Sequence, residues 1–429
     1  MSRGVQAGDS GQSLAAQRLA LRLVALYAAF FVLLGFCIDP PAAIGQGLLR
    51  IIASRDTLVT DYMGLGGMGA AFVNAGLLTL AACFIYWRTH AKINGAAVAC
   101  LFLVLGFALF GKNLLNVWCI VLGVLAYARF RREPFAQHIN TAFFGAALAP
   151  IFSEIVFSTA LPPAIGLPLG VATSLLIGFI LAPVAARLFQ AHQGLCLYNI
   201  GFTAGIVGTL VVAIYSAYGF VAQPVFIWTT GHNGLLGAVL FGSFAVFAAA
   251  GLYIDRGALA GLRRLMAQAG QAPADFLGDF GVGATLLNMS LTGALATGYL
   301  LLVGGDLNGP TIGAVLSVVG FSAAGKHPRN ILPVMVGVFA GSLAKPWNAH
   351  DPSMVLAALF GTNLAPIAGR YGWAWGVVAG LIHSSVAQSV GVLHGGLVLY
   401  NNGFAAGIVA SVLTPVIVAL KRRPPGSDT

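Results

Sequence analysis

Charged residues are scarce in this sequence. Asp, Glu, Lys and Arg make up 8 % of its 429 residues, and hydrophobic residues make up 58 %. Soluble domains carry about three times that share of charge, so we predict an integral membrane protein. This excludes a cytosolic enzyme, a nucleic-acid-binding protein and a disordered scaffold. The net charge of +10 then indicates Lys and Arg concentrated in cytoplasmic loops rather than a nucleic-acid partner.

Cysteine pairs and catalytic motifs are also missing. The five cysteines are Cys37, Cys83, Cys100, Cys119 and Cys196. They stand singly in apolar segments with no CxxC pair, which predicts neither a disulfide framework nor a metal site. The sequence has no Walker loop, no HExxH pair, no serine elbow and no paired acids within an apolar segment. We therefore expect no enzyme, no cofactor and no ATP-driven pump.

What the sequence does have is about 14 apolar segments, each near the length that an α-helix needs to cross a bilayer. Their approximate limits are 19–38, 62–87, 93–111, 114–130, 134–158, 166–190, 195–218, 226–254, 276–303, 307–325, 330–344, 350–370, 374–393 and 397–420. Residues 1–18 and 425–429 are predicted as polar tails, and residues 255–275 as a polar linker. The pattern predicts an all-α membrane protein whose first helix is retained, because no cleavage site follows it.

The positive charges give this topology an orientation. If all 14 segments cross and the N-terminus is cytoplasmic, 18 of the 22 Lys and Arg residues lie inside. If the fifth and twelfth segments were re-entrant, only 12 or 13 would lie inside. The first arrangement obeys the positive-inside rule better. It predicts a protein of the inner (plasma) membrane with both termini and the linker 255–275 cytoplasmic.

An internal repeat relates the two halves, residues 19–219 and 220–424. At an offset of 214, Asn94-Gly95 matches Asn308-Gly309, and Gly111-Lys112 matches Gly325-Lys326. Near the end of each half the offset is 202, where Leu197-Tyr198-Asn199 matches Leu399-Tyr400-Asn401. Seven segments in each half would insert the second half upside down, the inverted-repeat plan of many transporters and channels.

Asn74 and Asn288 are the first candidate site residues. Each lies near the middle of an apolar segment and follows a run of glycines that includes Gly67 or Gly281. Such glycines can unwind a helix, and polar membrane residues usually face a cavity or another helix. A substrate-binding pair is one interpretation, and an interhelical hydrogen bond with close glycine packing is the alternative.

Asn94 and Asn308 stand where a loop becomes a helix, and Thr311 follows in the second copy. Asn is a good helix N-cap, so a capped helix start is one interpretation. The other is a helix N-terminus within the membrane that attracts an anion or a polar ligand.

Pro150 and Pro366 fall inside the fifth and twelfth segments, where they should break the helix. Thr362 and Asn363 add polar groups beside the second proline. Broken helices at matching positions of two halves point to a binding site, although either proline alone is equally consistent with a packing kink.

Asn199 and Asn401 begin the last helix of each half and complete the candidate site. For these two, binding and structural roles stay open. Lys112 and Lys326 end matched helices, where we expect them to be anchors that reach the membrane surface.

Two families resemble the sequence. The motifs Gly304-Gly305-Asp306-Leu307-Asn308-Gly309-Pro310 and Gly325-Lys326-His327-Pro328 resemble a bacterial membrane-protein family of unknown function. The order of Asn288-Met289-Ser290-Leu291-Thr292-Gly293 and Asn308-Gly309 resembles urea transporters more weakly. That resemblance implies an inverted-repeat pore for a small neutral solute. The Leu-Thr-x-Pro-Phe filter of urea transporters is missing, so urea itself is not implied.

These patterns predict a transporter or channel-like permease for a small polar solute, which binds near the midplane between the repeats. One alternative is a cation-coupled carrier of an organic anion, and another is a membrane scaffold or lipid-handling protein. The expected partners are the lipid bilayer, the solute and a coupling cation. The sequence leaves homo-oligomerisation open.

Overall fold

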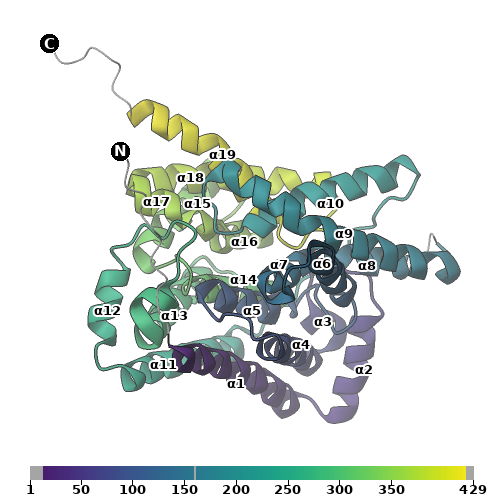
Figure 1. Cartoon of the computed structure of the whole chain (residues 1–429), viewed down its shortest axis with the longest axis horizontal. Helices are drawn as coiled ribbons and strands as arrows, with labels where there is room; N and C mark the ends of the chain where they lie inside the picture. The colour runs from purple at the N-terminus through teal and green to yellow at the C-terminus, as the bar shows by residue number, and fades with distance from the viewer. Residues whose placement is uncertain (1–12, 159–160, 422–429) are drawn as a thin grey trace.

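The computed structural model describes residues 13–158 and 161–421, and nearly all of its regular structure is α-helix (Figure 1). The helices of the first half are α1 (Leu14–Ile38), α2 (Pro41–Ile52), α3 (Tyr62–Gly66), α4 (Met68–Arg88), α5 (Gly95–Phe107), α6 (Trp118–Arg131), α7 (Ile139–Gly145), α8 (Ala149–Val156), α9 (Pro163–His192) and α10 (Asn199–Ala217). Those of the second half are α11 (Asn233–Ile254), α12 (Ala258–Leu265), α13 (Phe276–Leu302), α14 (Gly309–Phe321), α15 (Pro328–Ala344), α16 (Pro352–Gly361), α17 (Ala365–Tyr371), α18 (Trp373–Val390) and α19 (Asn401–Lys421).

Ten helices in the described ranges are long and apolar enough to cross a membrane, counting α7–α8 and α16–α17 as one helix each. The other four predicted segments form shorter helices. α5 and α14 have 13 residues each, α6 has 14 and α15 has 17, below the about 20 of a full span. The prediction of a multi-pass helical membrane protein is therefore confirmed.

The helices differ from the predicted segments in three places. α1 begins at Leu14, inside the predicted polar tail 1–18, because Ser13 caps it by accepting a hydrogen bond from the Ala16 N–H. Residues 1–12 of that tail and the predicted tail 425–429 lie outside the described residues. The predicted linker 255–275 contains α12. The amphipathic helix α2 was missed because Gln46 and Arg50, on its exposed side, interrupt the apolar run of the sequence.

Glycines and prolines break helices at matched places. Gly67 has φ 97° between α3 and α4, and Gly281, which lies 214 residues later, has φ 81° inside α13. A positive φ suits glycine and ends the regular helix. Pro150 and Pro366 each follow a short 3-10 turn and stand in the first turn of α8 and α17. Both predicted proline-broken helices are therefore present.

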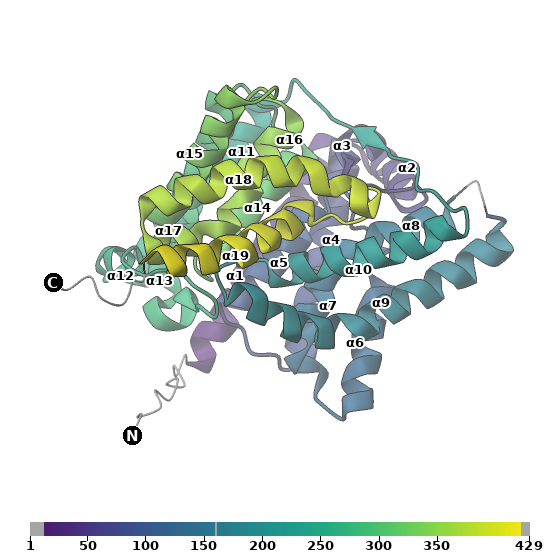
Figure 2. The ribbon, with the colours of Figure 1, turned by 90° about the horizontal axis from the view of Figure 1, so that it is seen from above.

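The two halves use the same helix pairs. α1 packs on α4 as α11 packs on α13, and α6 packs on α9 as α15 packs on α18. The main pairs that join the halves are α5 with α14 and α10 with α19. Figure 1 shows α5 and α14 in the middle of the ribbon. Figure 2 shows from above that the α6–α9 and α15–α18 pairs lie on different sides of this centre.

The central helices α5 and α14 run antiparallel. Gly95, which begins α5, lies against the carbonyl of Ala323, and Gly309, which begins α14, lies against that of Leu109. Both helices are almost entirely buried. A two-residue parallel pairing of β1 (Val59–Thr60) with β2 (Phe226–Ile227) ties a loop of the first half to the connection before α11.

Candidate functional site

Two lysines lie at the centre of the molecule. The side chains of Lys112 and Lys326 are fully buried, so the prediction that they anchor the helices at the membrane surface is wrong. α5 and α14 end in the interior, not at a membrane face. Gly111 and Gly325, with φ of 134° and 129°, then turn the chain back, which carries the following lysine into the core.

Each lysine binds a tyrosine of the other half. The Lys112 ammonium donates to the Tyr400 hydroxyl at 3.0 Å and to the Phe143 carbonyl at 3.1 Å. The Lys326 ammonium donates to the Tyr198 hydroxyl and to Thr362 Oγ1, both at 2.8 Å. These hydrogen bonds link the two halves. Lys112 and Lys326 stand at matched positions of the repeat, and so do Tyr198 and Tyr400.

Aromatic rings surround both ammonium groups. Lys112 Nζ lies 5.1 Å from the centre of the Tyr400 ring, and Lys326 Nζ lies 4.6 Å from that of Tyr198. Phe107 and Phe321 supply the second ring in each case, at 5.5 and 5.3 Å. Ring faces attract cations, so these rings offset part of the cost of burying each ammonium group.

The side-chain amides of Asn74 and Asn288 stabilise the turns that carry these lysines. The Asn74 amide donates to the carbonyls of Ala108 and Lys112, at 2.7 and 3.0 Å. The Asn288 amide donates in the same way to Ser322 and Lys326, at 2.8 and 2.7 Å. Both N–H donors of each amide are therefore used within the protein.

Asn94 and Asn308 are helix N-caps, one of the two roles considered for them. Asn94 accepts from the Ala97 N–H, and Asn308 forms a capping box with Thr311. The first free amide of each helix is held by an aspartate of the other half: Gly95 donates to Asp275 Oδ1 at 2.8 Å, and Gly309 to Asp61 Oδ1 at 3.2 Å. These carboxylates occupy the places that an anion would take at the helix N-termini.

The polar groups at the second broken helix lie near the Lys326 side chain. Thr362 precedes Pro366 and accepts from Lys326, while the Asn363 carbonyl accepts from the Leu197 N–H at 3.0 Å. At the first broken helix, the Ala147 carbonyl before Pro150 accepts from the Leu399 N–H at the same distance. The breaks thus free carbonyls that hold the loop before the last helix of the opposite half.

Asn199 and Asn401 pair with histidines. His192 Nε2 lies 3.0 Å from Asn199 Oδ1, and His394 Nε2 lies 3.0 Å from Asn401 Oδ1. Both asparagines also donate to a carbonyl of the preceding helix. Their helices meet where a Cβ added to Gly201 would lie 3.0 Å from the Gly403 Cα.

Two cavities near this centre have matched residues in their linings. The first has space for about 100 Å³ and is lined by Tyr198 and Tyr400. The second has space for about 160 Å³. Three matched pairs contribute one residue to each cavity: Phe144 and Phe360, Leu197 and Leu399, and Asn199 and Asn401. Both tyrosines line the first cavity and neither lines the second, while the lysines lie behind the tyrosines and line neither cavity.

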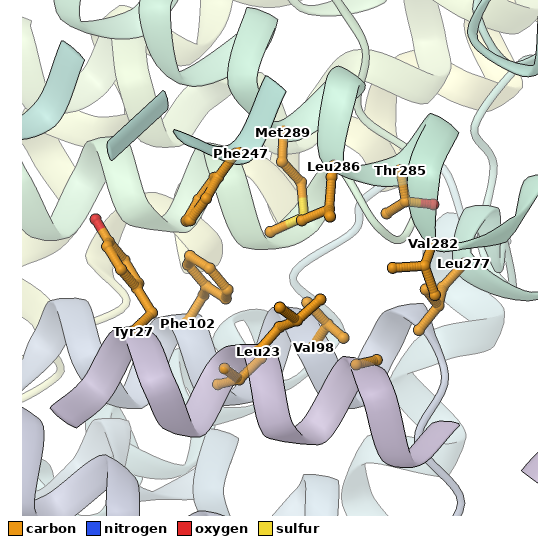
Figure 3. Close-up of a pocket in the computed structure, with 12 residues that line it drawn as sticks. Leu23, Tyr27, Val98, Phe102, Phe247, Leu277, Val282, Thr285, Leu286 and Met289 are labelled. Atoms are coloured by element: carbon orange, nitrogen blue, oxygen red, sulfur yellow. The ribbon is translucent and has the colours of Figure 1, made fainter. Parts of the chain in front are cut away.

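A separate apolar region lies between α1, α11 and α13. Figure 3 shows Leu23 and Tyr27 of α1 facing Phe247, Leu286 and Met289. The cavity that these residues line has space for about 40 Å³. A wider groove of about 540 Å³ adjoins it and is lined mainly by apolar side chains of α1 and α11. This region offers few polar groups to orient a solute.

A buried acidic cluster was missed by the sequence analysis. Asp56 is fully buried and accepts hydrogen bonds from Tyr62 at 2.9 Å, Ser153 at 2.8 Å and Asn116 at 3.1 Å. Burial raises its pKa to about 7, against the effect of these three donors. Burial also raises the pKa of Asp61. The position matched to Asp56 is Gly270, so this cluster exists in one half alone.

We expect Asp56→Asn to flatten the pH dependence of stability. A carboxyl whose pKa is raised in the fold stabilises most at low pH, and that contribution is lost as the pH rises through about 7. Between about pH 5 and pH 8 the wild type should lose about 2–3 kcal/mol that the variant does not lose. Thermal unfolding in detergent at both pH values measures this, with the partly exposed Asp255→Asn as control. If the stability of the wild type and of Asp56→Asn changed equally between the two pH values, Asp56 would be ionised in the fold at both of them.

The site thus combines predicted residues with unpredicted ones. The repeat motifs contained both Gly-Lys and Tyr-Asn, which was the available signal for the lysine–tyrosine contacts. The aspartates that cap α5 and α14 gave no local signal, because they are 180 and 248 residues from their partners. No cluster of three or more metal-ligating His, Cys, Asp or Glu side chains occurs in residues 13–158 and 161–421.

Comparison with known proteins gives one match. A family model described as "Protein of unknown function (DUF1576)" matches residues 41–217 and 254–419. No curated protein and no solved structure matches the chain.

Proposed function

The chain belongs to this family of unknown function, and we propose from its geometry that it is a membrane transporter or channel-like permease for a small polar solute. The observation that carries the proposal is the pair of cavities near the lysine–tyrosine contacts, to which three matched residue pairs contribute. Transporters built from inverted repeats bind their substrate near the bilayer midplane, where the two repeats meet.

We further propose that the two halves are inverted repeats. The antiparallel contact of α5 with α14 supports this, because a two-fold axis that relates antiparallel helices lies across them. The matched family segments also support it: an offset of 202 relates their ends, residues 217 and 419. In this arrangement the lysines lie near the midplane, and both termini lie on the cytoplasmic side of the inner membrane, as the charge distribution favours. The architecture would then be urea-transporter-like, with a different filter.

Solute flux into proteoliposomes tests the transport proposal. We expect the wild type to move at least one class among urea, ammonium compounds, amino acids and small carboxylates. Ile200→Trp places a large ring into the first cavity, which Ile200 lines, and should lower the flux at least about tenfold by blocking the passage. Ile206→Trp lies on the same helix with a 37 % exposed side chain and should leave the flux unchanged.

Two outcomes contradict the proposal. One is equal flux through Ile200→Trp and Ile206→Trp, which would place the passage elsewhere. The other is the absence of flux for every solute class in protein that elutes as a folded species.

The apolar groove between α1 and α11 favours a second candidate, a lipid-handling protein. Its volume of about 540 Å³ and its lining of side chains such as Leu26, Phe30 and Val246 suit an acyl chain. Scrambling of fluorescent phospholipids by the wild type, lost in Gly242→Trp, would support this candidate. The absence of scrambling would contradict it.

A further inference from the structure

The central lysines lack a counter-ion in the protein. Neither Lys112 nor Lys326 forms an ion pair with the described residues. The direct partners of both ammonium groups are neutral: two tyrosine hydroxyls, one threonine hydroxyl and one carbonyl. A buried cation is strongly unfavourable unless an opposite charge offsets it, so an anion from outside the chain would stabilise the charged form of these lysines.

A residue that lines the first cavity has an unused hydrogen-bond donor. Tyr400 lines that cavity, and its hydroxyl accepts from Lys112. Among the hydrogen bonds of the described residues it donates none. A hydroxyl that accepts from a cation becomes a stronger donor, because hydrogen bonds in a chain polarise one another.

The opposite tyrosine is arranged differently. Tyr198 accepts from Lys326 and also bonds with Ser317 within the protein. The cavity beside the two tyrosines holds about 100 Å³, room for a few non-hydrogen atoms. Positive charge, one available hydroxyl donor and this volume together define a site for a small acceptor.

We propose that the solute is a small anion, such as a short carboxylate or nitrate, which the Tyr400 hydroxyl binds in the first cavity. Lys112 and Lys326 supply the positive potential behind it and hold the two tyrosines in place. This inference rests on the proposed transport function. The lysines act as positioning residues, since Tyr198 and Tyr400 line the cavity and the lysines do not.

Selectivity of the wild-type protein gives the first test. Uptake of formate, acetate and nitrate into proteoliposomes is compared with uptake of urea and methylammonium, with the membrane potential clamped. We expect the anions to enter at least about tenfold faster than the neutral solute and the cation. Faster uptake of urea or methylammonium would overturn the anion inference and leave the transport proposal standing. The absence of uptake for all solutes would overturn the transport proposal itself.

Variants then assign the roles. Tyr400→Phe keeps the ring but removes the hydrogen-bond donor, so it should raise the KM for the anion at least about tenfold. A tenfold change corresponds to about 1.4 kcal/mol of binding free energy. Lys112→Met removes the charge and should lower anion uptake, while Lys112→Arg should restore part of it. Lys421→Met, which changes a lysine at the exposed end of α19, should leave uptake unchanged.

The Tyr400→Phe result decides the case if Lys112→Met does not fold. An unchanged KM in folded Tyr400→Phe would overturn the proposed binding role of the hydroxyl. An equal loss of uptake in Lys112→Met and Lys112→Arg would show that the shape of the side chain matters there and not its charge, and would also overturn the proposal.

Discussion

Replacing Gly95 by alanine is expected to abolish stable folding, and replacing Gly309 should come close to it. A Cβ at Gly95 would overlap the Ala323 carbonyl oxygen, and one at Gly309 would lie 2.5 Å from both the Leu109 carbonyl oxygen and Asp61 Oδ1. The obstacle is backbone in the centre of the molecule, which cannot rotate away as a flexible side chain does. Overpacking costs about 1–3 kcal/mol where side chains adjust, so we expect at least about 3 kcal/mol for Gly95→Ala.

Matched glycines provide the controls for this prediction. Gly242 in α11 and Gly45 in α2 have no atoms within 4 Å of an added Cβ. Alanine there should leave stability unchanged or raise it by about 0.5–1 kcal/mol, since alanine favours a helix interior over glycine. The amount of monodisperse protein and its melting temperature in detergent measure both effects. Equal melting temperatures for Gly95→Ala and Gly242→Ala would show that α5 and α14 do not pack this closely.

The close approach of α5 and α14 explains why both helices are short. Each begins beside the end of the other, so their lengths are fixed by the overlap and not by the thickness of a bilayer. The antiparallel pair needs a small residue at each start and a carboxylate to accept the exposed amide there, which Asp275 and Asp61 provide. The chain can then reverse at the interior end of each helix and present a lysine.

Local signals in the sequence were sufficient for several features. Asn94 and Asn308 cap helices, and Pro150 and Pro366 begin the second part of broken helices, because capping and helix breaking depend on neighbouring residues alone. The long apolar helices followed from hydropathy for the same reason.

The remaining features depend on distant contacts, which no window of sequence contains. Lys112 was assigned to the surface because it follows an apolar run, although α5 stops in the interior and its lysine meets Tyr400, 288 residues away. The burial of Asp56 beside Ser153 was equally hidden, since these residues are 97 positions apart. The repeat nevertheless named most of the residues that meet at the centre, because each repeated lysine contacts the repeated tyrosine of the other half.

Replacing Asn288 by leucine is expected to cost about 2–6 kcal/mol of stability. Its amide satisfies the carbonyls of Ser322 and Lys326, and each buried carbonyl left without a donor costs about 1–3 kcal/mol. Asn288→Asp should be worse than leucine, because a carboxylate would face both carbonyl oxygens at hydrogen-bond distance. Asn74→Leu should behave like Asn288→Leu, since Asn74 makes the matching bonds to Ala108 and Lys112.

A valine variant of a buried threonine of α4 serves as the control for the two leucine variants. The comparison distinguishes a structural role of the asparagines from solute binding. Thr79 is fully buried and its hydroxyl donates within its own helix, so Thr79→Val should cost no more than about 1.5 kcal/mol. If Asn74 and Asn288 brace the lysine turns, their leucine variants lose stability and flux together, and thermal unfolding reports the loss without any solute. If the asparagines bind the solute directly, the variants melt with the wild type and lose flux alone. The geometry favours the first result, because both donors of each amide already bond to the turn that carries the lysine.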